Sequence, residues 1–152
     1  MQQLIGEWHG TGTAIFPTID TTTYREVLQF EPHADDTILK IEQKTWRIHP
    51  DQAESLLYWE CGFLRQLTDT TYEWINAQNN GRTEVLKGEM TYEEGQLSLN
   101  FVSKVFSNDV RMVASQRILD VKDDVLSYTT HMATQTHPSL QQHLIAELRR
   151  VR

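Results

Sequence analysis

The sequence reads Gly6-Glu7-Trp8-His9-Gly10-Thr11-Gly12 near its start, and Phe16-Pro17-Thr18-Ile19 follows closely. The alternation places the three glycines on one face of a strand predicted over residues 4–15. Glycine inside a strand adds backbone entropy and packs no side chain, so we expect either another segment of the chain or a ligand to pass close to the backbone there. A bend in a curved sheet is the simpler explanation, whereas the rest of the chain favours a ligand.

Length and composition predict one globular domain over residues 1–152, with 39% hydrophobic residues. The chain has no apolar run of roughly 18 residues, the length that spans a bilayer, and its start lacks the pattern of a secretory signal. The net charge of −7 argues against nucleic acid or an anionic membrane as partner. The single cysteine, Cys61, fits a reducing compartment. We therefore expect a cytoplasmic protein with a small-molecule partner, and a homodimer as a further option.

Short segments of alternating apolar and polar residues run along most of the chain. They predict strands over residues 4–15, 26–30, 38–46, 61–66, 72–77, 82–90, 96–104, 110–119 and 125–132. Eight or nine strands without intervening helices indicate an antiparallel sandwich or barrel. Gln43 and Thr45 share a face with Leu39 and Ile41. Since a filled sandwich core tolerates few such polar residues, we favour a barrel with a partly polar cavity.

The C-terminal segment fits two structures. As a strand it places Leu144, Ala146 and Leu148 on one face, and a closed barrel needs a last strand to pair with the first. Pro138 fits the first turn of a short helix before that strand. The helical alternative rests on the spacing of Leu140, Leu144, Leu148 and Val151.

Few residues suggest chemistry by spacing alone. His131, His137 and His143 are separated by six residues each, which matches no zinc motif, so a three-histidine metal site is the weaker alternative. Cys61 lies in a predicted strand, where we expect a buried structural thiol. Its neighbours Glu60 and Arg65 flank an apolar segment, and we expect them to form a structural ion pair.

A series of short motifs runs in one order along nearly the whole chain. After Gly-x-Trp-x-Gly-x-Gly and Pro17-Thr18-Ile19 come Tyr24-x-Glu26, Gln43-Lys44-Thr45-Trp46, Glu60-Cys61-Gly62-Phe63-Leu64-Arg65, Ala77-Gln78-Asn79, Glu84-Val85 with Gly88-Glu89, Met132-Ala133-Thr134 and Gln142-His143-Leu144. This series resembles the nitrobindins, a family of haem-binding β-barrels. The resemblance implies an all-β, antiparallel barrel of about ten strands, similar to lipocalins and fatty-acid-binding proteins, that holds haem b near one mouth.

The resemblance also implies which residues bind the haem. His143 matches the family's proximal iron ligand, and a neutral imidazole suits that role. Thr18 matches a haem-contacting threonine, and Met132 matches a residue that lines the pocket. Where the family commonly has a distal histidine, this chain has Tyr58. We expect the Tyr58 phenol to donate a hydrogen bond to an iron-bound ligand or to pack over the porphyrin.

For function, the resemblance implies ferric haem b that isomerises peroxynitrite to nitrate and binds nitric oxide. A peroxynitrite isomerase is therefore the candidate activity, with His143 on the iron. The alternative is a non-catalytic carrier of a small apolar ligand such as a fatty acid, because barrels hold such ligands in their mouths. That alternative gains weight if Tyr58 and Trp59 block the haem.

Overall fold

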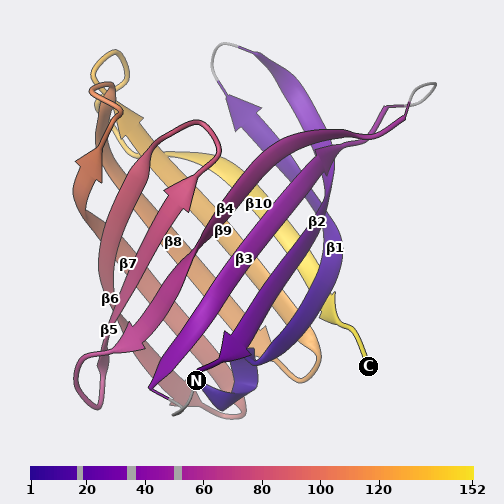
Figure 1. The fold of residues 1–152 in the computed structure, drawn as a ribbon, viewed down its shortest axis with the longest axis vertical. Coiled ribbons are helices and arrows are strands. Elements are labelled where there is room, and N and C mark those ends of the chain that lie inside the picture. The colour runs from indigo at the N-terminus through magenta and orange to yellow at the C-terminus, as the bar shows by residue number, and fades with distance from the viewer. Residues whose placement is uncertain (17–18, 34–36, 50–52) are drawn as a thin grey trace.

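Ten antiparallel strands form a closed barrel in the computed structural model, which describes residues 1–16, 19–33, 37–49 and 53–152 (Figure 1). A 3-10 turn, η1, precedes them. The elements are η1 (Gln2–Leu4), β1 (Gly6–Phe16), β2 (Ile19–Pro32), β3 (Ile38–Arg47), β4 (Ser55–Gln66), β5 (Thr71–Gln78), β6 (Thr83–Glu93), β7 (Gln96–Ser107), β8 (Met112–Lys122), β9 (Val125–Thr134) and β10 (Gln141–Arg150).

Each strand pairs with its neighbour in sequence, and β10 closes the ring by pairing with β1. Closure leaves no sheet edge exposed. The structure confirms the predicted antiparallel barrel of about ten strands. Two strands begin earlier than predicted, β2 at Ile19 and β4 at Ser55, because pairing with the neighbouring strand extends segments that lack clear apolar alternation.

The C-terminal segment is a strand, and the helix predicted at Pro138 is absent. Between β9 and β10 the main chain of Thr134 and His137 exchanges two hydrogen bonds, 2.9 and 3.0 Å long, which close a turn. The next residues run into β10, where Ala146 and Leu148 point inward as the strand alternative predicted. Barrel closure thus overrides the helical preference of this segment, and the 3-10 turn of the described chain lies at the N-terminus instead.

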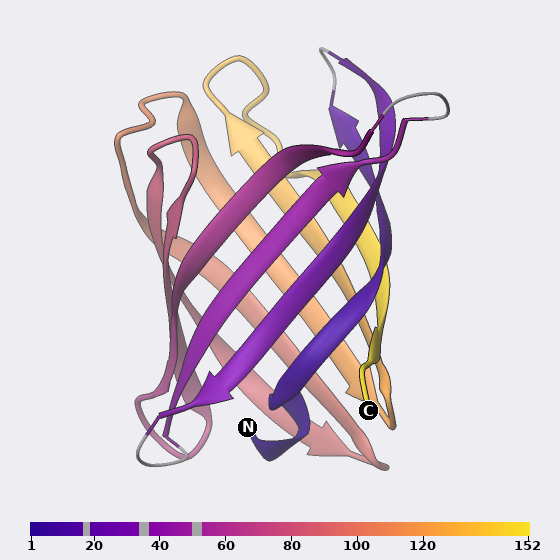
Figure 2. The ribbon, with the colours of Figure 1, turned by 45° about the vertical axis from the view of Figure 1, so that its right-hand side comes forward.

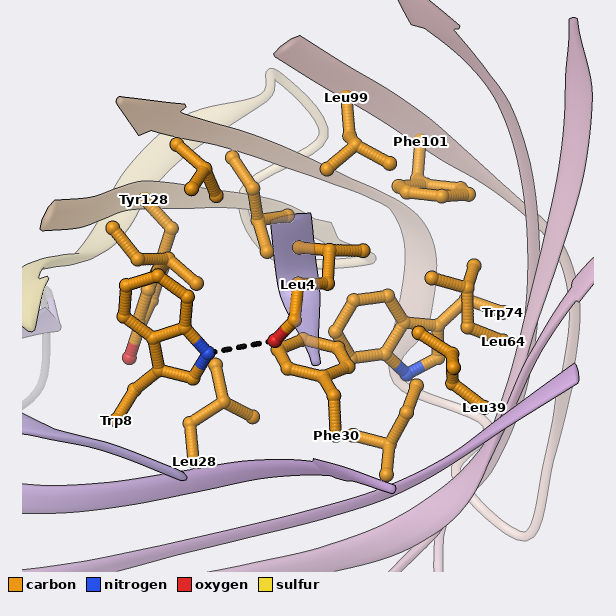
Figure 3. Packing of buried hydrophobic residues seen from close by; sticks show 14 of the residues in the cluster. Leu4, Trp8, Leu28, Phe30, Leu39, Leu64, Trp74, Leu99, Phe101 and Tyr128 are labelled. Carbon is orange, nitrogen blue, oxygen red and sulfur yellow. Dashed lines mark hydrogen bonds between the residues drawn. The ribbon is translucent and has the colours of Figure 1, made fainter. Parts of the chain in front are cut away.

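Turn η1 lies across one end of the barrel, beside the N-terminus (Figure 2). Its Leu4 side chain is fully buried, and the indole of Trp8 donates a hydrogen bond of 2.8 Å to the Leu4 carbonyl oxygen (Figure 3). The main apolar cluster surrounds this pair and includes Leu28, Phe30 and Trp74. Trp8 thus belongs to the core at the end of the barrel that η1 closes.

The glycines of β1 are required by close approach, as predicted, but the approaching group is the chain itself. A Cβ at Gly10 would collide with main-chain atoms of Glu147 and Leu148 in β10. A Cβ at Gly12 would collide with the ring of Tyr24 in β2. The expectation that a ligand approaches these glycines is therefore wrong. The glycines let the first strand pack tightly against the last one and against an inward-pointing tyrosine.

Candidate functional site

A cavity of about 520 Å³ occupies the barrel at the end away from η1. Leu28, Trp74 and Leu119, which also belong to the apolar cluster, bound it below, and Asn80 and Arg111 lie at its mouth. The volume falls within the roughly 300–1,000 Å³ typical of small-molecule sites. The two ends of the barrel thus differ: one is packed, and the other is hollow.

His143 lines this cavity from a β-bulge in β10. The register with β9 passes from Gln142 opposite His131 to Leu144 opposite Thr130, so His143 is the extra residue. Bulges re-aim side chains, and here both His143 and Leu144 line the cavity instead of alternating across the sheet. The bulge therefore adds an inward histidine without disturbing the inward face of the strand below it.

Two contacts fix the His143 ring. Its Nδ1 lies 3.0 Å from the carbonyl oxygen of Ile15, and its ring stacks on that of Phe16 at a centroid distance of 4.9 Å. A carbonyl oxygen only accepts, so Nδ1 carries a proton, and in the neutral ring the lone pair is on Nε2. His143 is 7% exposed. An oriented imidazole with its second nitrogen held by a carbonyl is the arrangement that metal-binding histidines use.

The other residues expected to contact haem are only partly described. Met132, near the end of β9, lines the cavity opposite Gln141 of β10. Thr18 lies outside the described residues. Tyr58 also lines the cavity, so the structure brings Tyr58, Met132 and His143 to one space.

A second bulge positions Tyr58. Thr45 of β3 pairs with Tyr58 of β4, and the next residue, Trp46, pairs with Leu56, so Leu57 is the extra residue of the bulge. Both Leu57 and Tyr58 line the cavity. The phenol of Tyr58 donates a hydrogen bond of 2.5 Å to Glu60 Oε2. Burial, and then the charge of Glu60, raise the pKa of Tyr58 well above its ordinary value. Tyr58 is therefore a neutral phenol whose proton is already engaged.

Glu60 belongs to a buried ion cluster beneath the cavity. Arg117 in β8 donates to both oxygens of Glu60, at 2.5 and 2.8 Å, and to Glu84 in β6 at 3.3 Å. The hydroxyl of Ser115 donates to the other oxygen of Glu84. Burial acts to lower the pKa of Arg117, but the pairing with Glu60 and Glu84 raises it well above its ordinary value. Since a buried charge must be paired, this cluster fixes the charge state of the cavity floor.

The predicted ion pair between Glu60 and Arg65 is wrong. Five residues separate them, so in one strand they point to opposite faces of the sheet. Glu60 points inward to Arg117, whereas Arg65 points outward and pairs with Glu73 of β5 at 2.6 Å. The same alternation puts the Cys61 side chain on the outer face of the sheet, where it is exposed. The prediction of a buried thiol is therefore wrong.

Glu26 is a buried carboxyl beside the cavity, and it forms no ion pair within the described part of the chain. Glu26 accepts hydrogen bonds of 2.6 Å from both Tyr128 and Gln43, and the Tyr128 hydroxyl lies 2.9 Å from that of Tyr24. Burial raises the pKa of Glu26 to about 7, against the lowering effect of the bonds from Tyr128 and Gln43. The cavity wall includes Tyr24, Gln43 and Tyr128. These hydrogen bonds therefore connect the buried carboxyl group of Glu26 to the cavity wall.

The remaining histidines form no metal site in the described chain. Among the described residues, no group of three histidine, cysteine or acidic side chains is arranged to hold a metal ion. The three histidines considered above, His131, His137 and His143, are therefore not such a group. His137 lies at the cavity mouth, and His9 on the outside pairs with Glu7 at 2.6 Å. Within the same residues, no helix has the length and apolar character needed to cross a membrane.

Arg117 is the residue that the sequence interpretation missed. The pattern Ser115-x-Arg117-x-Leu119 places it on the same strand face as an apolar residue, as Gln43 lies beside Ile41. An inward-facing arginine requires a buried acidic partner. That partner is Glu60, 57 positions away across the barrel, and strand periodicity does not indicate such pairs.

A closed barrel, packed at one end and hollow at a histidine-lined mouth, defines the class of small-molecule-binding barrels. The family model for the THAP4-like, heme-binding beta-barrel domain matches residues 1–150. The chain belongs to this family, which confirms the resemblance and the predicted haem cofactor.

Two curated relatives and one solved structure show how far this similarity extends. The chain is 32% identical over 148 residues to the peroxynitrite isomerase Rv2717c of Arabidopsis thaliana, covering 97% of this chain and 85% of the relative. It is 34% identical over 148 residues to peroxynitrite isomerase 1 of Rhodococcus jostii, covering 95% and 79%. The crystal structure of Rv2717c from M. tuberculosis superposes with a TM-score of 0.89 at 28% identity, covering 99% of this chain and 94% of that one.

Proposed function

We propose that this protein binds haem b in the barrel cavity as one domain over residues 1–152, with His143 as the proximal iron ligand, and isomerises peroxynitrite to nitrate. Relatives that align over nearly the whole chain carry the name peroxynitrite isomerase. The same site is proposed to bind nitric oxide.

The observation that carries the proposal is the bond between His143 Nδ1 and the Ile15 carbonyl oxygen. It holds the protonated Nδ1 on the main chain, so in the neutral ring the lone pair of Nε2 lies on the other side, where a metal can use it. The stacked Phe16 ring restricts rotation of the imidazole. The residues present therefore fit an axially ligated haem.

The other cavity residues have distinct proposed roles. When bound, haem supplies an iron centre that rearranges peroxynitrite. Met132 would pack against the macrocycle from β9 and Tyr58 would face it from β4. Thr18, which follows β1 in the sequence, is proposed to contact it as well. The apolar residues Leu28 and Leu119, beside the ion cluster, help to exclude water from the buried part of the cavity, and the mouth lets small anions enter and leave.

Titration with haemin tests the proposal. Wild-type protein is expected to bind one haem with a Soret band typical of histidine ligation, and His143→Ala is expected to lose that band. His137→Ala is the matched control, because this histidine lies at the same cavity mouth on the loop before β10. Stopped-flow decay of peroxynitrite, with nitrate as the measured product, then tests catalysis by the loaded protein.

The outcomes separate the two candidate functions. A wild-type protein that binds no haem would refute the proposal. Tight binding of a fluorescent fatty acid by that same protein would favour the carrier alternative, which the apolar residues Leu28, Trp74 and Leu119 of the cavity would suit. Haem binding without faster decay of peroxynitrite would leave a binding role alone. A cytoplasmic location and a homodimer belong to the proposal too, and sedimentation measures the latter.

A further inference from the structure

Tyr58 is placed across the cavity from His143. Around the closed barrel, β4 is four strands from β10 in one direction, through β1, β2 and β3, and six in the other. Both side chains line the same cavity. A ligand held between His143 and the opposite wall therefore meets the wall that carries Tyr58.

The single phenolic proton of Tyr58 points away from that ligand space. It is donated over 2.5 Å to Glu60 Oε2. Glu60 is 1% exposed and is held by two hydrogen bonds from Arg117. A guanidinium keeps its charge under all ordinary conditions, so its bidentate partner is ionised, and an ionised carboxylate only accepts.

A phenol has one proton to donate and two lone pairs to accept with. With the proton engaged by Glu60, the Tyr58 oxygen has only lone pairs to offer elsewhere. Turning the proton toward the cavity would leave Glu60 Oε2 with one fewer donor in a buried site, which costs free energy. The Glu60–Arg117 pair thus fixes the direction in which the Tyr58 hydroxyl donates its proton.

We propose that Tyr58 presents a hydrogen-bond acceptor, not a donor, to the ligand on the haem face opposite His143. This inference rests on the proposed function. Tyr58 is then a specificity-determining residue: it favours ligands that carry a hydrogen, such as water or a protonated oxyacid, and disfavours bare anions. It also reverses the donor role expected from the sequence.

The ferrous carbonyl complex gives a readout independent of activity. Lone pairs next to bound carbon monoxide oppose electron donation from iron into the ligand and strengthen its C–O bond. We expect the infrared C–O stretch of wild type to lie at higher frequency than that of Tyr58→Phe. Tyr92→Phe, at an exposed tyrosine of β6, is the control and leaves the stretch unchanged.

A wild-type stretch equal to or lower than that of Tyr58→Phe overturns the inference. Azide affinity of the ferric protein gives a second test, because removing the lone pairs should strengthen binding of this anion several-fold in Tyr58→Phe. Unchanged or weaker azide binding counts against the proposal.

A measurement without haem keeps the inference distinct from the proposed function. In the haem-free protein the bond to Glu60 should protect the Tyr58 hydroxyl proton from exchange, giving a downfield proton resonance that Tyr58→Phe removes. Absence of that resonance in wild type overturns the inference whether or not haem binds. Failure to bind haem, with the resonance present, instead refutes the proposed function.

Discussion

The imidazole of His143 in the last strand is held by the main chain of the first strand, with Nδ1 3.0 Å from the carbonyl oxygen of Ile15. The contact joins residues 128 positions apart, and it exists because β10 closes the barrel against β1. Closure therefore does more than remove a sheet edge. It supplies the acceptor that determines which nitrogen of His143 faces the cavity.

Removing the imidazole should be reversible by adding it back. We expect His143→Ala to lose axial ligation while keeping the barrel, because the side chain lies in a bulge and belongs to the cavity rather than to the main apolar cluster. Free imidazole should enter the vacated space and restore the histidine-type Soret band. Absorption spectra of the variant with increasing imidazole measure the return of the band. The prediction would be contradicted if the same imidazole concentrations produced the same band in a haem solution without protein.

Glu26 should make the fold less stable at high pH. Its pKa is about 7 in the folded protein against an ordinary 4.5, so the folded state binds more protons than the unfolded state between these values. The free energy of unfolding then falls as pH rises through this range. The contribution is fully present below pH 4.5 and is lost as pH rises through about 7, with an upper bound of about 3 kcal/mol.

Glu26→Gln is expected to remove that dependence, since an amide never ionises; its oxygen still accepts from Gln43, while its NH2 group donates to the Tyr128 hydroxyl. Arg117 and Glu60 also act on this carboxyl and are unchanged in the variant. Urea unfolding at pH 5 and pH 8 compares the two proteins. Glu89→Gln, at an exposed site of β6, is the control. An equal loss of stability in wild type and Glu26→Gln between the two pH values would place the titrating group elsewhere.

Arg117 should be the most sensitive residue of the cavity floor. Arg117→Met leaves the buried Glu60 and Glu84 without their shared cation, a loss that typically costs about 3–5 kcal/mol. Glu60→Gln should cost less, because Glu84 still pairs with the guanidinium. Arg149→Met removes one member of an ion pair whose side chains are 72% and 63% exposed, so it should stay within about 0.5 kcal/mol of wild type. Chemical denaturation of the haem-free proteins measures all three, and equal losses in Arg117→Met and Arg149→Met would refute the assignment.

The sequence predicted the barrel because its main signal is local. Alternation over residues 38–46 places Leu39 and Ile41 on the buried face and Gln43 beside them, and the structure keeps that face. The helix expected at Pro138 did not form, because pairing of β10 with β1 and β9 depends on residues distant in sequence.

The site was less accessible to sequence interpretation. Tyr58, Met132 and His143 were singled out by family resemblance, while spacing alone gave His143 no special role. The inward placement of Tyr58 and His143 depends on bulges, which periodicity does not indicate. The sequence analysis expected Tyr58 to donate its proton to the iron-bound ligand. In the structure the Tyr58 hydroxyl donates to Glu60 instead.

The glycines of β1 offer a final test of how tightly the barrel closes. In Gly10→Ala the added Cβ meets main-chain atoms of β10, which move only if the two strands separate. We expect a loss of about 1–3 kcal/mol, the usual cost of overpacking. In Gly12→Ala the obstacle is the ring of Tyr24, which is buried and bonded to Tyr128; because a side chain moves without separating the strands, the loss should be smaller.

Thr11→Ala, at the exposed position between these glycines, controls for changes in strand propensity. Thermal unfolding of the three variants gives the order. The pairing of β1 with β10 brings Gly10 against β10 and also brings the Ile15 carbonyl against His143. If Gly10→Ala is no less stable than Thr11→Ala, the two strands are not in that close contact.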